Sequence, residues 1–469
     1  MSKHLSSYLT LCFLVLVYWS EIGEATSRKL KDEISLSTQK NEQPYRTGYH
    51  FQPPSMWMNG PMLYKGVYHF FYQYNPLAAT FGDIIVWGHA VSYDLVNWIH
   101  LDPAIYPTQE ADIGSSRQVQ DLAWPKDLSD PFLREWVKYN GNPIITPPEG
   151  VKDDCFRDPS TAWQGPDGVW RLVVGADRDN NGMAFLYQST DFKKWERYEQ
   201  PLASGDGTGT WECPDFFPVP LNSTNGLDTS AYSGGVMHVM KAGFEGHDWY
   251  TIGTYSPDRE NFLPQNGLSS PGNSLNLRYD YGQFYASKSF FDDAKNRRIL
   301  WAWVPETDSQ EDDIAKGWAG LQSFPRAGAF GPFGLLAMAS KDLEEQTAIF
   351  FRVFQNQNGR YSVLMCSDLS RSTVRSNIDT ASFGAFVDID PQYNEISLRN
   401  LIDHSIIESF GAEGKTCITS RTYPKFVNNE DAHLYVFNNG TQSVKISQMS
   451  AWSMKNAEFV MDQTLKSSA

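Results

Sequence analysis

The sequence has little basic charge for its length, and its only long hydrophobic run lies at its beginning. It contains 39 Lys and Arg residues against 55 Asp and Glu residues, a formal net charge of −16 and a pI near 5.0. Such a chain repels polyanions, so neither nucleic acid nor an anionic membrane surface is an expected partner. No later stretch approaches the roughly 20 apolar residues of a membrane helix. The composition favours a neutral substrate.

Long helical periodicity is also scarce. Short runs rich in aromatic and β-branched residues, bounded by Gly, Pro, Asn and Asp, occur instead, and such runs are typical of strands. They lie at residues 66–74, 169–174, 235–240 and 298–304. The pattern predicts an all-β barrel, sandwich or propeller.

The first 25 residues predict a secretory signal. Lys3 and His4 precede a mainly apolar run over residues 9–17, and Gly23-Glu24-Ala25 is a small-x-small cleavage site. We expect cleavage near Ala25 and exclude residues 1–25 from the fold. Residues 26–44 are polar and charged, and we expect a flexible leader there.

Cysteine is scarce, with five residues, and Cys12 would leave with the signal. In an oxidising compartment one disulfide is expected, and Cys366 with Cys417 is the preferred pair because both lie in the C-terminal region. Asn222 and Asn439 begin acceptor sequons and are expected glycosylation sites, although such tripeptides also occur by chance.

One seven-residue pattern occurs twice, as SYDLVNW at residues 92–98 and STDFKKW at residues 189–195. Both read Ser-x-Asp, an apolar residue, two variable positions and Trp. Recurring supersecondary units indicate propeller blades. A chance match is the alternative, because turns with Ser, Asp and Trp are common in β proteins.

The character of the sequence changes from about Ala327. Residues 330–334 read FGPFG and introduce alternating strands, as a separate β-sandwich would show. These strands are expected at residues 348–353, 361–365, 385–389 and 434–437. We therefore expect a catalytic domain over residues 45–326 and a sandwich over residues 327–469.

Three clusters combine tryptophan or arginine with carboxylate, amide and proline residues, at residues 57–61 (WMNGP), 156–159 (FRDP) and 211–215 (WECPD). They resemble the motifs of glycoside hydrolase family 32, whose members cut β-fructofuranosyl bonds with a five-bladed β-propeller followed by a β-sandwich. The resemblance runs from about Tyr45 to the C-terminus, with support from residues 72–76 (YQYNP) and 87–89 (WGH). The order and spacing of these motifs together are specific to the family, although each motif alone is weak evidence.

The resemblance implies a retaining mechanism, in which two carboxyl groups lie about 5–5.5 Å apart. Glu212 is implied as the general acid/base and Asp158 as the transition-state stabiliser, with Arg157 keeping Asp158 ionised. Substrate-binding residues are implied at Trp57, Asn59, Gln73, Phe81, Arg157, Cys213 and Trp318. The implied site needs neither a metal nor another cofactor.

Each role has a structural alternative. Glu212 could be a surface carboxylate in a turn, and Asp158 could belong to an Asp-Pro turn held by a salt bridge. Aromatic residues most commonly serve in buried ring packing.

The chain departs from the family pattern at three places. The first motif in the family reads Trp-Met/Ile-Asn-Asp-Pro-Asn-Gly-Pro, and its Asp is the nucleophile, whereas here Asn59 is followed directly by Gly60. No carboxylate occurs between Glu42 and Asp83. Further gaps follow Gly114, which leaves the first blades incomplete, and Arg326, where family members carry a cysteine that could bond to Cys417. Our hypothesis is that the three in-frame losses reflect skipped exons or an imperfect gene model.

The loop at residues 242–248 (AGFEGHD) lacks the Asp and Lys that sucrose-cleaving members place there, so it looks like the fructan exohydrolases. The resemblance implies release of terminal fructose from β-(2,1)-linked fructans by a monomer in the apoplast, cell wall or vacuole, impaired because the nucleophile is absent. The alternatives are an acid invertase acting on sucrose, a non-catalytic fructan-binding protein, and a chain that does not fold because blade strands are missing.

Overall fold

The structure is a computed structural model, and within it almost every regular element is a strand. It describes residues 13–15, 45–53, 60–80, 85–107, 118–221, 223, 225–232, 234–265, 277–322, 333–355, 361–387, 395–427, 431–438 and 444–461. Within these ranges no helix has the length and apolar character needed to span a membrane.

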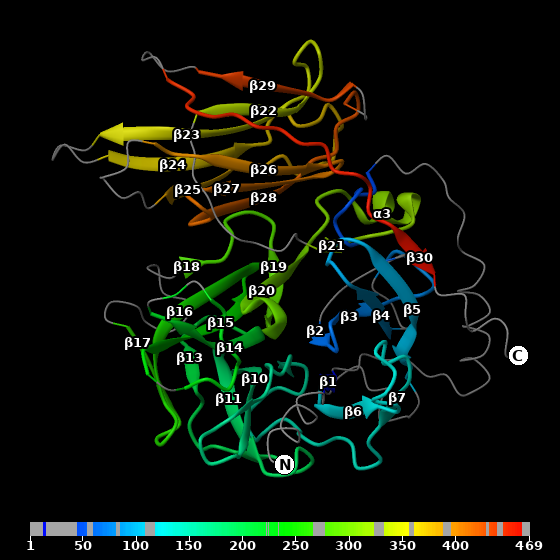
Figure 1. Cartoon of the computed structure of the whole chain (residues 1–469), viewed down its shortest axis with the longest axis vertical. Coiled ribbons are helices and arrows are strands. Elements are labelled where there is room, and N and C mark those ends of the chain that lie inside the picture. Colours follow the sequence, from blue (N-terminus) through cyan, green and yellow to red (C-terminus); the bar gives the residue numbers. More distant parts are fainter. Residues whose placement is uncertain are drawn as a thin grey trace, which may run out of the picture.

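Five sheets follow one another along the chain and form the lower part of the molecule in Figure 1. The first contains β2 (Pro61–Tyr64), β3 (Val67–Tyr74), β4 (Val86–Ser92), β5 (Trp98–Ile105) and β30 (Phe459–Met461). The second contains β1 (Phe13–Val15), β6 (Asp121–Pro125) and β7 (Trp136–Lys138). Its first strand therefore comes from the segment that we predict to be the signal.

The third sheet contains β8 (Phe156–Arg157), β9 (Trp163–Gln164), β10 (Trp170–Arg178), β11 (Asn181–Ser189), β12 (Glu196–Arg197) and β13 (Ala203–Gly205). The fourth contains β14 (Glu212–Pro220), β15 (Val236–Phe244), β16 (His247–Ser256), β17 (Asn261–Pro264) and β18 (Leu277–Arg278). The fifth contains β19 (Tyr285–Asp292), β20 (Arg297–Val304) and β21 (Leu321–Gln322), with the short helices η2 (Asp293–Lys295) and α3 (Gln310–Lys316) beside them.

Two further sheets form the β-sandwich in the upper part of Figure 1. One contains β22 (Gly334–Ala339), β23 (Thr347–Gln355), β24 (Tyr361–Asp368), β25 (Phe383–Val387) and β29 (His433–Phe437). The other contains β26 (Leu398–Asp403), β27 (Ile406–Gly411) and β28 (Thr416–Arg421). The prediction of an all-β propeller followed by a sandwich is confirmed. The predicted boundary between residues 326 and 327 lies outside the described residues.

The sheets of the propeller are buried on both faces, as blades packed side by side must be. In β10, Leu172 and Val174 belong to one hydrophobic cluster and Val173, between them, belongs to another. Side chains alternate across a strand, so neighbouring residues reach opposite faces of the sheet. Such a strand reads as a continuous apolar run, which explains why residues 169–174 were recognisable in the sequence.

The repeated heptad forms the same turn in two blades. In the first sheet, the Ser92 hydroxyl accepts the Leu95 N–H at 2.8 Å; in the third, Ser189 accepts the Phe192 N–H at 2.9 Å. The apolar residue is left-handed in both turns, with φ of 70° for Leu95 and 63° for Phe192. Asp94 caps the two variable positions of the first turn by accepting their N–H groups. The heptad is therefore a blade repeat and not a chance match.

The predicted disulfide between Cys366 and Cys417 is wrong, because the two thiols are not bonded to each other. They lie on strands of different sandwich sheets and point in opposite directions. Ser367, on the strand of Cys366, and Ser420, on the strand of Cys417, face each other across the sandwich, with their hydroxyl oxygens 2.8 Å apart. Cys366 and Cys417 are each an odd number of residues away from these serines, so both side chains point away from the space between the two sandwich sheets.

A buried ion network fastens the segment before the propeller to the sandwich. His50 Nδ1 lies 2.8 Å from Asp403 Oδ2, and its Nε2 lies 3.1 Å from Glu408 Oε2. Asp403 also accepts the backbone N–H groups of Gly48 and Tyr49. Burial alone lowers the pKa of His50, but the hydrogen bonds and charges of the two carboxylates outweigh it and raise the pKa to about 9.

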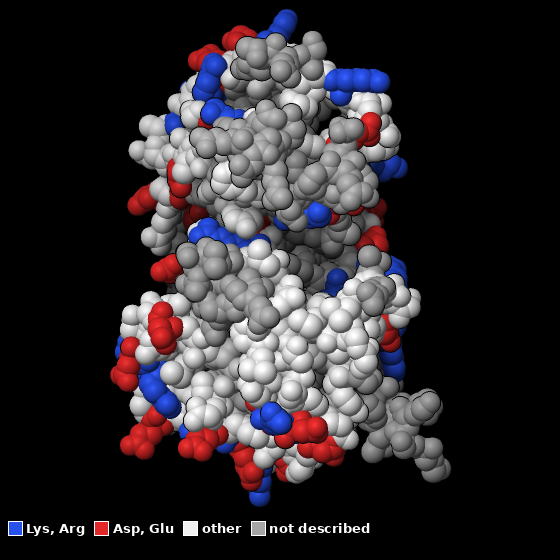
Figure 2. Space-filling view, turned by 90° about the vertical axis from the view of Figure 1, so that its left-hand side faces the viewer, with Lys and Arg blue, Asp and Glu red and all other residues white. Residues whose placement is uncertain are grey.

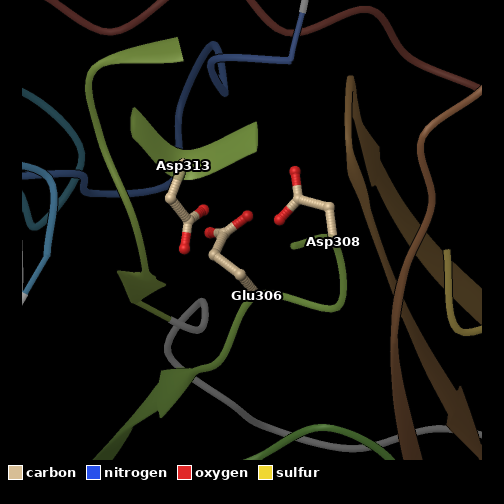
Figure 3. Close-up of side chains that lie close together, drawn as sticks. All are labelled: Glu306, Asp308 and Asp313. Atoms are coloured by element: carbon tan, nitrogen blue, oxygen red, sulfur yellow. The ribbon is translucent and has the colours of Figure 1, made fainter. Parts of the chain in front are cut away.

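Figure 3 shows a second ionic cluster, at the junction of the fifth sheet with the sandwich. Its three carboxylates, Glu306, Asp308 and Asp313, surround the ammonium of Lys316, which lies 3.1 Å from Glu306 and 2.8 Å from Asp308 and also pairs with Asp313. From β28, Arg421 donates to Glu306 at 2.7 Å. The three acids are close enough to hold a metal ion, but Lys316 and Arg421 already occupy the space between them and offset two of the three negative charges. The cluster therefore joins two domains.

We predict that the free energy of unfolding falls as the pH rises from about 6.5 to about 9. His50 binds its proton more tightly in the folded chain, so its contribution is complete below the unfolded pKa and is lost as the pH passes the folded pKa. His50→Gln should remove up to about 3 kcal/mol of this decline in denaturant unfolding. His433→Gln, on β29, is the control and should keep the decline; an undiminished decline in His50→Gln would contradict the prediction.

A second prediction concerns Asp313, whose pKa is raised to about 6, chiefly by burial. A raised carboxyl pKa means that the folded chain takes up a proton between about pH 4 and 6, so this group stabilises the fold at low pH and loses that effect as the pH rises. The melting temperature of Asp313→Asn, measured relative to that of the parent at the same pH, should therefore increase as the pH rises from about 4 to 6. Glu311→Gln, an exposed change on the same helix, should track the parent, and parallel curves for Asp313→Asn would refute the assignment.

Candidate active site

Four of the predicted site residues come together where β8 ends and β14 begins. Arg157 is the last residue of β8 and Glu212 the first of β14, and Asp158 and Cys213 follow them. Arg157 Nη2 donates to Glu212 Oε1, and the Cys213 N–H donates to Asp158 Oδ2 at 2.9 Å. Two of the three sequence motifs therefore meet in one cluster.

Backbone geometry at this cluster is unusual. Asp158 and Cys213 both adopt left-handed conformations, with φ of 62° and 47°. Such conformations cost of order 1–3 kcal/mol each and persist where the surroundings impose them. Both segments also pack tightly against Gly175 of β10, where a Cβ would lie 2.2 Å from Trp211 O and 3.2 Å from Arg157 O. Only glycine lets both strands approach β10 so closely.

Arg157 connects the two carboxylates. Besides its bond to Glu212, its Nε lies 3.9 Å from Asp158 Oδ2. Its Nη1 donates to Gln118 Oε1 at 3.0 Å and to Asp154 O at 2.8 Å, which fixes the guanidinium in place. The side chains of Asp158 and Glu212 are 14% and 28% exposed, so both carboxylates remain accessible from solvent.

Tyr285, the first residue of β19, completes the surroundings of Glu212. Its hydroxyl donates to Glu212 Oε2, so both oxygens of the carboxylate accept a hydrogen bond. Burial raises the pKa of Tyr285 well above its usual range, and the charge of Glu212 adds to this effect. The phenol therefore stays protonated and donates. Tyr285 was not among the predicted site residues, because an aromatic residue at the start of a strand carries no distinguishing signal in the sequence.

Cys213 is a neutral donor in this site. Its side chain is buried, and burial, together with the nearby Asp158 carboxylate, raises the pKa of its thiol well above the usual value. The thiol lies 3.5 Å from Asp158 Oδ2. A protonated thiol is a poor nucleophile, so its role here is to contact and orient Asp158.

The other predicted substrate-binding residues do not join this cluster in the described structure. Gln73 lies half-buried in β3, opposite Trp87 of β4. Trp318 is buried between the guanidinium of Arg46 and the ammonium of Lys316. Both assignments stay predictions. Outside the described residues lie Trp57, Asn59, Phe81, Asn222 and Asn439.

The surface agrees with a neutral ligand. On the face shown in Figure 2, the described Lys and Arg side chains are dispersed among acidic ones and form no continuous basic patch. The cluster itself offers a guanidinium, a phenol, a thiol and two carboxylates, which suits the hydroxyl groups of a sugar and proton transfer at Glu212.

Comparisons with known proteins match both parts of the fold. The model for the N-terminal domain of glycosyl hydrolases family 32 matches residues 50–116 and 111–330, and the model for the C-terminal part matches residues 268–453. The first match is divided near the predicted gap after Gly114. An insoluble isoenzyme of beta-fructofuranosidase from Arabidopsis thaliana is 44% identical over 536 residues, with 89% of this chain and 97% of the relative covered. The alignment is longer than this 469-residue chain, so the relative carries segments that have no counterpart here.

Solved structures extend the similarity to three dimensions. The crystal structure of fructan 1-exohydrolase IIa from Cichorium intybus matches with a TM-score of 0.87 and 68% identity, covering 91% of this chain and all of that chain. A variant of that enzyme in complex with 1-kestose gives a TM-score of 0.86 and 69% identity, with 90% of this chain and all of that chain covered. The family models and the solved structures match both the propeller and the sandwich, and the chain belongs to glycosyl hydrolases family 32.

Proposed function

We propose that the chain has the site of a retaining fructan exohydrolase, which releases terminal fructose from β-(2,1)-linked fructans. The observation that carries this proposal is the cluster of Arg157, Asp158, Glu212 and Tyr285, at the end of β8 and the beginnings of β14 and β19. The chicory relative that binds 1-kestose supports the choice of substrate class. Fructans are neutral, so the net charge of −16 does not repel them as it would repel a polyanion.

Each residue of the cluster has a role in this proposal. Glu212 is the general acid/base, and Tyr285 and Arg157 orient its two oxygens. Asp158 accepts hydrogen bonds from fructose hydroxyls and stabilises the positive charge that develops on the ring in the transition state. Trp57, Asn59, Gln73, Phe81 and Trp318 are proposed to line the sugar pocket.

The hairpin between β15 and β16 supports an exohydrolase over an invertase. It turns on only two residues, Glu245 and Gly246, whose φ values of 51° and 72° are typical of a tight turn. The acid that follows, Asp248, is buried and paired with Lys241 at 2.9 Å. Neither turn residue is the Asp or the Lys that we expect in this loop of a sucrose-cleaving member. Sucrose hydrolysis is the same-class alternative.

The absent nucleophile is the reason to propose impaired turnover. No carboxylate occurs between Glu42 and Asp83, so the strand that begins at Pro61 offers no acid to attack the sugar. Loss of a covalent nucleophile from an otherwise intact site costs roughly 10⁴-fold or more in rate. The same observation favours a second candidate function, a fructan-binding protein that retains Asp158, Arg157 and Glu212 but does not cleave.

We propose the secretory pathway as the route of this protein, with residues 1–25 as signal, 26–44 as leader, 45–326 as the catalytic domain and 327–469 as the sandwich. The insoluble beta-fructofuranosidase among the relatives supports the cell wall as its destination. A vacuolar location and a monomeric state are further proposals.

We predict that inserting Asp-Pro-Asn after Asn59 restores cleavage. The insertion returns the nucleophile to a site whose acid/base is in place, so fructose release from 1-kestose should rise by roughly 10⁴-fold over the parent. Released fructose is the measurement, on 1-kestose and on sucrose, with each protein checked for monomeric, folded material. Faster release from sucrose than from 1-kestose would favour the invertase alternative.

Two controls separate chemistry from folding. Inserting Asn-Pro-Asn at the same place restores chain length without the carboxylate, and should leave the rate at the parent level. Glu212→Gln in the Asp-Pro-Asn background should lose cleavage again. Saturable 1-kestose binding by the parent without hydrolysis favours the binding protein, whereas a folded Asp-Pro-Asn variant that cleaves neither sugar contradicts the proposed function.

A further inference from the structure

Lys288, in the middle of β19, reaches the two segments that carry Asp158 and Glu212. Its ammonium donates to Pro214 O at 2.8 Å, to Pro159 O at 3.0 Å and to Asp158 O at 3.4 Å. An ammonium has three N–H donors, so all three are used on main-chain carbonyls. One side chain thus joins the fifth sheet to the third and the fourth.

Both segments need such a donor because both interrupt their strands. Pairing of β8 with β10 involves only Phe156 and Arg157 and ends before Asp158. Pairing of β14 with β15 shifts register between Glu212 and Asp215. Carbonyls at interruptions of this kind lose their sheet partners, and buried carbonyls require another donor.

Lys241 supports the second interruption from the other side. Its fully buried ammonium donates to Cys213 O at 3.1 Å and to Ser287 O at 2.9 Å, and it pairs with Asp248. The consecutive carbonyls of Cys213 and Pro214 therefore accept from two different lysines. The bulge that carries Glu212 is held between them.

The contacts of Lys288 differ from those of an ordinary counter-ion. None of its three hydrogen bonds goes to a carboxylate, although Asp158 and Asp215 lie near enough for their charges to act on it. We propose that Lys288 is a positioning residue of the active site: by tying the interruption after Arg157 to the one after Glu212, it sets the Asp158 and Glu212 side chains relative to each other. This inference rests on the proposed function, since the two carboxylates act there on one sugar ring.

Hydrogen exchange tests the proposal in the chain as it stands. Lys288→Met keeps the length of the side chain and removes its charge and donors. Exchange of the Cys213 amide, which donates to Asp158, should rise by about tenfold or more while amides of the sandwich keep their rates. Lys295→Met, an exposed lysine between β19 and β20, is the matched control and should leave the Cys213 amide unchanged.

Kinetics in the Asp-Pro-Asn background provide the functional readout. Lys288→Met should lower kcat on 1-kestose by about 10²-fold with a much smaller change in KM, because misplaced catalytic groups cost rate more than binding. Lys288→Arg keeps the charge but not the three-way geometry and should recover only part of the loss. Lys295→Met should match its parent.

Several outcomes would overturn the inference. These are an unchanged Cys213 amide, full activity in Lys288→Arg, or faster exchange throughout the molecule, which would indicate a general structural role. If the Asp-Pro-Asn parent itself cleaves nothing, the proposed function fails, and the exchange of the Cys213 amide alone decides the role of Lys288.

Discussion

A hydrogen bond between Asp158 and Cys213 joins the two strained segments of the active site. The Asp158 carboxylate accepts the Cys213 N–H, and both residues are left-handed. This bond joins the third and fourth sheets at the end where Arg157 and Glu212 project. The interruptions after Arg157 and after Glu212 are thus connected by a direct hydrogen bond as well as by Lys288. The site therefore depends on backbone strain that its neighbours maintain.

A few polar contacts also connect the propeller to the sandwich. Two ionic clusters, one around His50 and one around Lys316, connect segments far apart in the sequence. Buried charges are costly unless they are paired and hydrogen-bonded, so each cluster tolerates few alternative arrangements. The relative position of the propeller and the sandwich is therefore fixed by these ion pairs as well as by apolar packing.

Local patterns predicted the fold well, and long-range contacts were the part that they missed. The heptads at residues 92–98 and 189–195 identified blades because their hydrogen bonds are internal to seven residues. The Cys366–Cys417 prediction failed because nearness in sequence says nothing of which face of a sheet each side chain occupies. Tyr285 and Lys288 could not be found from the chain alone, since their roles depend on strands contributed by three different sheets.

The pairing of β30 with β5 brings a consequence for how the molecule is made. Residues 459–461 run parallel to residues 98–100 and cover the outer edge of the first sheet. Because β30 begins at Phe459, far along the chain from the end of β5 at Ile105, β5 has an open edge until β30 has been synthesised. An uncovered strand edge is a template for pairing with other chains. For this protein, the interval between translating β5 and translating β30 is therefore a period of exposure to aggregation.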